Sequence, residues 1–293
     1  FLIRTEPGKY EMKQVQELQL TDQVVIRHMV KNIPDTGTTM AVLQKEDIQE
    51  KQYYMELLDL WINTPLSVER LKIMARLLGA NGHLYVNMDR ERVAKFYVET
   101  EMDAKQLADD ITALGFDEVT VCKQHTKILF SQKEAEKIGW QVVKGGAFAY
   151  LLSLLGGGKD KIPDWLLQAE LSVKREFLSG FQGIHGRCMS FDVVKPRLGI
   201  TYQSIGNSSF TETIGYMEQI SRMFKELGIE CHVKSSPQVG ICFDNSTENL
   251  ATYADTIYYA YCEDKRRRSA IVIEHIKKQE AQLTKRARIM IAG

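Results

Sequence analysis

The chain has few cysteines, no excess of either charge and no long apolar run. Its 5 cysteines show no paired metal-ligand spacing, so we expect no zinc site and a reducing, intracellular environment. No stretch is long and apolar enough to predict a membrane span. Because 38 basic side chains balance 38 acidic ones, net charge gives no general attraction to nucleic acid. Phe1 is not a natural start, so a targeting peptide could precede it.

An internal repeat is the main feature that is present. Residues 74–82 and 178–186 are both rich in apolar and small residues and end in a polar residue followed by glycine, Asn81-Gly82 and His185-Gly186. A similar order of elements follows each stretch, at an offset of 185 minus 81, or 104 residues. This predicts two pseudo-symmetric helix-strand-strand-helix-strand-strand-helix units on one chain, an α+β fold.

The periodicity places the elements of each unit. For the first unit it predicts strands at 83–86, 93–98, 118–122 and 127–130, a helix at 104–114, and apolar helices around Ala135 and Phe148. For the second it predicts strands at 187–194, 199–205, 229–234 and 239–243, and helices at 212–227 and 249–261.

Four pieces of the sequence together resemble one known family. They are the two repeated stretches, the approach to the second at 161–181, and a closing segment at 253–262. Their order and spacing are similar to those of the LAGLIDADG (dodecapeptide) homing endonucleases of the intein-encoded kind. The resemblance implies that the two motif helices pack closely through small residues, here Ala75, Gly79 and Ala80 opposite Ser179, Gly180 and Gly183. It also implies that the strands of both units form a β-saddle that follows the DNA major groove.

The motif acids of that family are missing. Its active members hold Mg²⁺ with the penultimate Asp of each motif, and this chain has Asn81 and His185 at those positions. An amide oxygen is neutral, and an imidazole suits softer metals than Mg²⁺. We therefore expect no catalytic residue, no metal and no cofactor here, and no efficient DNA cleavage. Both residues also suit the end of a helix, where each precedes a glycine.

Loss of cleavage leaves nucleic-acid binding open. Side chains alternate between the two faces of a strand, and this alternation predicts which of them lie on the concave face of the saddle. The candidates, whose polar or cationic groups could contact phosphates or base edges, are Lys95, Tyr97, Arg197, Thr201, Gln203, His232 and Lys234. Beyond it, residues 265–293 hold nine Lys or Arg and two acids, so Arg266, Arg267 and Arg268 are further candidates for phosphate contact. The alternative for both sets is a solvated surface.

The first 65 residues carry a second resemblance. Segments at 1–4, 10–18 and 22–26 look like strands of an intein splicing (Hint) domain, although ordinary strands remain an alternative, and 40–61 predicts a linking helix. Splicing itself is not expected, because the chain begins with Phe1 and ends in Ala292-Gly293, without the nucleophile and the His-Asn pair of that reaction.

Together these observations predict four parts and leave three functions open. The parts are an intein-like remnant (1–65), two LAGLIDADG units (66–160 and 161–262) and a basic helical tail (263–293). The leading function is a cleavage-deficient, domesticated monomer that binds DNA or structured RNA. The alternatives are an active metal-dependent DNA endonuclease, and a structural component of a ribonucleoprotein or another large assembly.

Overall fold

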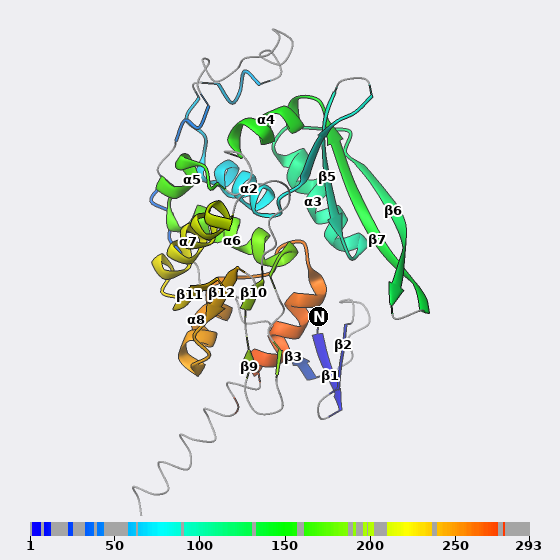
Figure 1. Cartoon of the computed structure of the whole chain (residues 1–293), viewed down its shortest axis with the longest axis vertical. Helices are drawn as coiled ribbons and strands as arrows, with labels where there is room; N and C mark the ends of the chain where they lie inside the picture. Colours follow the sequence, from blue (N-terminus) through cyan, green and yellow to red (C-terminus); the bar gives the residue numbers. More distant parts are fainter. Residues whose placement is uncertain are drawn as a thin grey trace, which may run out of the picture.

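A computed structural model of the protein gives the architecture (Figure 1). It describes residues 2–6, 9–12, 23–25, 33–37, 40–43, 58–62, 64–88, 91–130, 133–156, 161–186, 190–191, 196–197, 199–201, 210–235, 239–274 and 278.

The first unit has the expected order of elements. It runs α2 (Val68–Gly79), β4 (His83–Val86), β5 (Arg92–Val98), α3 (Glu101–Ala113), β6 (Thr120–Phe130), β7 (Lys133–Gly145) and α4 (Ala147–Leu155). The strands form an antiparallel sheet in the order β4-β5-β7-β6. The side chains of Ser67 and Thr100 accept backbone N–H bonds at the starts of α2 and α3, which satisfies donors that a helix leaves unpaired.

The second unit has the same succession of helices, with three short strands between its first two helices in place of two. After the short helix α5 (Asp164–Gln168) come α6 (Leu171–Ile184), β8 (Ser190–Phe191), β9 (Pro196–Arg197), β10 (Gly199–Thr201), α7 (Phe210–Glu226), β11 (Cys231–Lys234), β12 (Gly240–Phe243) and α8 (Thr247–Thr256). One sheet has the order β10-β12-β11, and β8 pairs with β9. The fold is therefore α+β with two copies of one unit, as the repeat predicts.

Two further regions flank the units. Near the N-terminus, β1 (Leu2–Glu6), β2 (Lys9–Met12) and β3 (Gln23–Val25) form an antiparallel sheet in the order β2-β1-β3, so strands lie in the three segments where the sequence predicts them. After α8, residues 263–274 are helical. In the described part of the chain, no helix combines the length and the apolar character that a membrane crossing requires.

The main sheet of each unit, β4-β5-β7-β6 in the first and β10-β12-β11 in the second, packs against helices on one face. In the first unit, α3 and α4 pack on the sheet, and the alternate residues Ala94, Phe96 and Val98 of β5 are buried with Val142 of β7. In the second, α7 packs on β11 and β12. The period-two burial of β5 is the pattern of a strand with one solvent-facing side, so each unit keeps a second sheet face outside the core.

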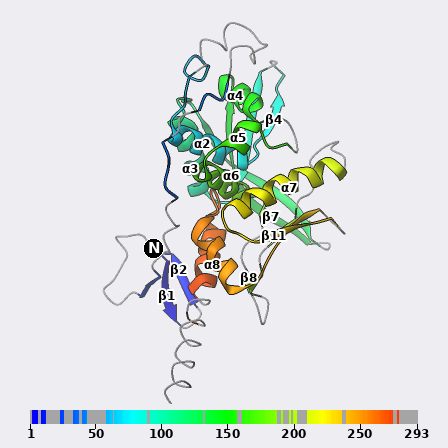
Figure 2. The ribbon, with the colours of Figure 1, turned by 90° about the vertical axis from the view of Figure 1, so that its left-hand side faces the viewer.

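The two units meet through α2 and α6, whose backbones touch. A Cβ added at Gly79 would lie 2.1 Å from Phe177 O, and one added at Gly180 would lie 2.2 Å from Arg76 O. Each glycine therefore lies directly on the backbone of the other helix, close to both C-terminal ends. Helix α6 also packs against α7 on its other side (Figure 2). The predicted close helix pair is confirmed.

Not every small residue of the motifs lies at this contact. A Cβ at Gly183 would lie 1.7 Å from Ala260 O, and Ser179 O accepts from Ala260 N at 3.1 Å. Ser179 and Gly183 are one helical turn apart, so they share the face of α6 that receives the segment after α8. The expectation that both residues oppose α2 was wrong.

Three predicted helices need correction. Residues 40–61 do not form one helix, because Met40 and Leu43 make β-bridges with Leu66 and Ile62 and 58–61 form a turn; residues 44–57 lie outside the described part. Ala135 lies in β7, paired with Ile128, so β6 and β7 form one long hairpin in place of two short strands and a helix. The last predicted helix ends at Thr256 rather than at residue 261, because 257–262 is non-helical, with a turn at 260–261, and packs against α6 through the bond from Ala260 N to Ser179 O.

The helix contact gives a first prediction. Gly180→Ala should lower the free energy of unfolding by about 1 to 3 kcal/mol or more, because the new methyl overlaps the α2 backbone, which has no alternative rotamer. Chemical denaturation monitored by circular dichroism measures the loss.

Gly215→Ala is the matched control, since Gly215 is also helical but has nothing within 4 Å of an added Cβ. It should stabilise the protein by roughly 0.5 to 1 kcal/mol through helix propensity. Equal effects of the two substitutions would mean that the helices do not touch.

Candidate nucleic-acid interface and the base of the helix pair

The base of the helix pair is where α2 and α6 end. Asn81 follows the last turn of α2, is exposed and adopts a positive φ of 49°. Its N–H donates to Leu78 O at 3.0 Å. Asparagine tolerates this left-handed conformation better than most residues do, so Asn81 ends α2 as the sequence allows.

His185 ends α6 in a different environment. Its N–H donates to Phe181 O at 2.8 Å, and its ring lies 5.2 Å from the Phe181 ring, centroid to centroid. Burial, together with the positive charge of Lys265, lowers the pKa of His185 to about 4. At neutral pH the imidazole is therefore uncharged.

Lys265 is the charged group at this helix end. Its Nζ donates to Gly183 O at 2.6 Å and lies 3.3 Å from Gln182 O and 3.5 Å from Ile184 O. These carbonyls form the negative end of the α6 dipole, where a cation is stabilising. A neutral amide, a neutral imidazole and an ammonium do not fit Mg²⁺, which takes anionic oxygen ligands. Among the described residues, no group of three His, Cys, Asp or Glu side chains could hold a metal ion.

The free face of the first sheet is polar. Tyr97 is 51% exposed, and Lys95, two residues earlier, lies with its Nζ 5.3 Å from the centroid of the Tyr85 ring. Tyr97 pairs with Gln141, and Gln141 pairs with Cys122, so these side chains share the face. The Gln141 amide donates to the Gln124 amide oxygen. Lys95 and Tyr97 therefore lie where the sequence places them, beside two glutamines.

The second sheet shows a matching pattern over fewer described residues. His232 and Lys234 of β11 are exposed, whereas Cys231 of the same strand is buried against α7, with its Sγ 3.3 Å from Ser221 Oγ. The other strand candidates are described less fully: Arg197 lies in β9 and Thr201 in β10, with their side chains outside the described part, and Gln203 lies outside it altogether.

The three arginines after α8 differ in their surroundings. Arg266 is held inside the protein, because its Nη2 lies 3.0 Å from Asp103 Oδ1 and its Nη1 bonds Gln106 Oε1 and Tyr259 O. Arg267 and Arg268 each lie 2.8 Å from a carboxylate oxygen of Asp264 and are 40% and 61% exposed. Arg266 thus serves the fold, and the other two lie on the solvent side of residues 263–274.

A pocket of about 270 Å³ lies where the first sheet meets the base of the helix pair. Tyr97 and Gln124 line it from the sheet, Gly183 and Ile184 from the end of α6, and Tyr261 and Lys265 from the segment after α8. The free sheet face is therefore continuous with the end of α6, although the two are far apart in sequence.

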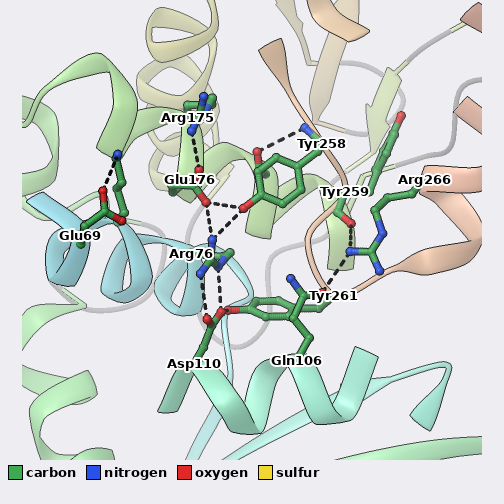
Figure 3. Close-up of polar contacts among 12 residues, drawn as sticks. Glu69, Arg76, Gln106, Asp110, Arg175, Glu176, Tyr258, Tyr259, Tyr261 and Arg266 are labelled. Atoms are coloured by element: carbon green, nitrogen blue, oxygen red, sulfur yellow. Dashed lines mark hydrogen bonds and ion pairs between the residues drawn. The ribbon is translucent and has the colours of Figure 1, made fainter. Parts of the chain in front are cut away.

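A buried ionic network holds the two units together around the helix contact (Figure 3). Arg76 of α2 makes two bonds of 2.8 Å to the Asp110 carboxylate of α3 and one of 2.7 Å to Glu176 Oε2 of α6. Tyr258 Oη donates to Glu176, Tyr261 Oη donates to Asp110, and Arg175 Nη2 bonds Glu176 Oε1 at 2.9 Å. One guanidinium thus joins both units and the segment after α8.

Protonation in this network is stable. Burial raises the pKa of Tyr258 and of Tyr261 above the ordinary value for a phenol, and the neighbouring Glu176 and Asp110 add to the effect. Burial opposes the charge of Arg76, yet the surrounding Tyr261, Tyr258 and Asp110 keep the pKa of Arg76 above its ordinary value. Both hydroxyls therefore remain donors and Arg76 remains charged over the accessible pH range.

Sequence reasoning missed three parts of this region. Gln124 and Gln141 were detectable, because Thr120, Cys122 and Gln124 alternate with period two, as a half-exposed strand requires. Arg76 and Lys265 left no such sign, since their partners lie 100 and 82 residues away, at Glu176 and Gly183.

Comparisons with known proteins give partial matches. No protein-family model matches the chain. It is 29% identical over 248 residues to the tRNA-splicing ligase RtcB of Pyrococcus furiosus. The matched region is 77% of this chain and 25% of that protein. It is 24% identical to the replication factor C small subunit (75% of this chain, 13% of that protein) and to the RNA polymerase subunit Rpo1N (78% and 17%), both of Methanocaldococcus jannaschii. The chain spans a quarter or less of these relatives.

Similar solved structures include two homing endonucleases. I-WcaI bound to its DNA recognition sequence overlaps with a TM-score of 0.48 at 10% identity, over 76% of this chain and 94% of that one. I-DmoI in complex with DNA and Ca overlaps with a TM-score of 0.45 at 14% identity, over 70% and 98%. The full-length DUF199/WhiA protein of Thermatoga maritima overlaps with a TM-score of 0.41 at 13% identity, over 78% and 70%.

The ionic network gives a second prediction. Arg76→Ala leaves Asp110 and Glu176 without their central cation and should lower the free energy of unfolding by about 3 to 5 kcal/mol. Adding Glu176→Gln should recover part of this loss, because it removes one of the stranded charges. Arg268→Ala, at an exposed pair, should cost less than about 1 kcal/mol, and a similar loss for both arginines would contradict the network.

His185 gives a prediction for pH. Because its folded pKa lies below the unfolded value, the unfolded chain binds more protons between about pH 6.5 and 4, and stability falls as the pH falls through this window. The pKa of about 4 corresponds to a loss of about 3 kcal/mol once the pH has fallen through this window. His185→Gln should remove this part of the pH dependence in urea unfolding measured at several pH values. An unchanged profile would place the titration elsewhere.

Proposed function

We propose that this chain is a homing-endonuclease-derived module that binds duplex DNA and does not cleave it. The observation that carries the proposal is the end of the helix pair: two motif helices in backbone contact end in Asn81 and His185, neither of which offers a carboxylate. Metal-assisted phosphodiester hydrolysis needs anionic ligands for its divalent ions. Their absence at both motif positions supports a loss of cleavage with the scaffold retained.

The pattern of relatives supports the origin. A tRNA-splicing ligase, a replication factor subunit and an RNA polymerase subunit have no common activity, yet each matches most of this chain over 13 to 25% of its own length. A segment shared by such different proteins behaves as an insertion rather than as part of their activities. We propose that this chain is such an insertion, of the intein-encoded kind, with 1–65 as what remains of the splicing domain.

The sheet faces support binding to nucleic acid. Lys95 and Tyr97 on the first free face and His232 and Lys234 on the second combine cations with hydrogen-bonding groups. Lysines neutralise phosphates, and glutamines such as Gln124 and Gln141 can bond adenine edges in the major groove. The internal repeat supplies both faces from one chain, so we propose that the protein binds as a monomer. Arg267 and Arg268 would add phosphate contacts beside the sheets.

The test is the salt dependence of binding. A duplex selected from a random pool should bind the intact chain, measured by fluorescence anisotropy. Lys95→Ala and Lys234→Ala should each weaken binding and reduce the slope of log K against log salt by about one. Lys105→Ala, an exposed lysine on the helix that covers the opposite face of the first sheet, should change neither.

Three results would contradict the proposal or the surface that it assigns to DNA. An absence of binding at low salt would remove the nucleic-acid function and favour a structural role in an assembly. Sequence-specific cleavage of the selected duplex by the unmodified chain in Mg²⁺ or Mn²⁺ would favour an active endonuclease. Equal losses from Lys95→Ala and Lys105→Ala would place the DNA on a surface other than the sheet face.

A further inference from the structure

The turn that carries Lys265 is fixed by a buried carboxylate. Asp103 of α3 is fully buried, and its oxygens accept the Glu263 N–H at 2.9 and 3.2 Å and lie 3.0 Å from Arg266 Nη2. A carboxylate at the start of a helix satisfies its first N–H groups and is favoured by the dipole. The first turn of residues 263–274 is therefore held from both sides of Lys265.

This anchoring directs the ammonium to the end of α6. Lys265 lies between Glu263 and Arg266 on that turn, and its Nζ reaches the carbonyl oxygens of residues 182–184. Three carbonyls around one cation resemble the oxygen surroundings of a bound metal ion. Holding a long lysine side chain in one such position costs rotamer entropy. Here the bonds of Asp103 to Glu263 and Arg266 already fix the backbone on both sides of Lys265.

We infer that the ammonium of Lys265 takes the place of a divalent cation at the base of the helix pair. It balances the negative end of α6, lies beside the motif position His185, and leaves a positive charge where a second cation would be repelled. The scaffold therefore keeps a charge at this point without carboxylates or metal. This inference concerns the charge at the helix ends and goes beyond the proposed function, so its test uses no nucleic acid.

The experiment measures Mn²⁺ binding to the full chain from the electron paramagnetic resonance signal of the unbound ion. The double variant Asn81→Asp, His185→Asp restores a carboxylate to each helix end and should bind Mn²⁺ more tightly than the unmodified chain. Adding Lys265→Met should tighten Mn²⁺ binding by at least about tenfold, because the competing charge is removed. Adding Lys265→Arg instead, which keeps the charge, should leave the affinity near that of the double variant.

Arg268→Met in the same double background is the matched control, since Arg268 lies on the same helical segment and pairs with Asp264. It should not tighten binding, and near-ultraviolet circular dichroism checks that each variant stays folded. Three results would overturn the inference: Lys265→Met without effect on Mn²⁺ affinity, no Mn²⁺ binding even with both acids restored and the lysine removed, or tight Mn²⁺ binding by the unmodified chain.

Discussion

The contact between the backbones of α2 and α6 is the constraint on which the rest of the structure depends. Gly79 and Gly180 each lie where a methyl group would overlap the other helix, so the helices have one distance and one rotation about their axes. That rotation brings Arg76 opposite Glu176 and places the two C-terminal ends together. The strands that follow each helix then leave from one common point, which is how a repeated unit builds two sheets around a shared centre.

The charges around this contact are satisfied mainly within the protein. Arg76 is surrounded by two carboxylates and two tyrosines, Asp103 by Arg266 and a helix N-terminus, and the end of α6 by Lys265. A buried charge is tolerated when it is paired and hydrogen-bonded. The same pairing keeps these groups from contact with a ligand, which is why we propose the sheet faces, where Lys95 and Lys234 lie, as the binding surface.

Much of the fold is predictable from local sequence patterns. The period-two alternation of β5 and the helical spacing of α3 and α7 follow from which side of each element faces the core. The failures have physical causes. Residues 257–262 look helical by composition, but the hydroxyls of Tyr258 and Tyr261 bond Glu176 of α6 and Asp110 of α3, and the chain is non-helical there, with a turn at 260–261. The sequence predicts that Ser179 and Gly183 of α6 face α2, because a small side chain does not indicate which neighbouring segment packs against it. The partners of Lys265 and Arg266 lie 82 and 163 residues away, at Gly183 and Asp103, and a local charge pattern does not encode them.

We propose that one rigid helix pair directs two sheet faces onto one nucleic acid. Hydroxyl-radical footprinting of a selected duplex tests it most directly, with Lys95→Ala and Lys234→Ala compared with the unmodified chain. The account predicts protection of two adjacent half-sites, the first variant losing protection in one half and the second variant in the other. Loss of protection in the same half for both variants, or a footprint confined to one half of the duplex, would contradict it.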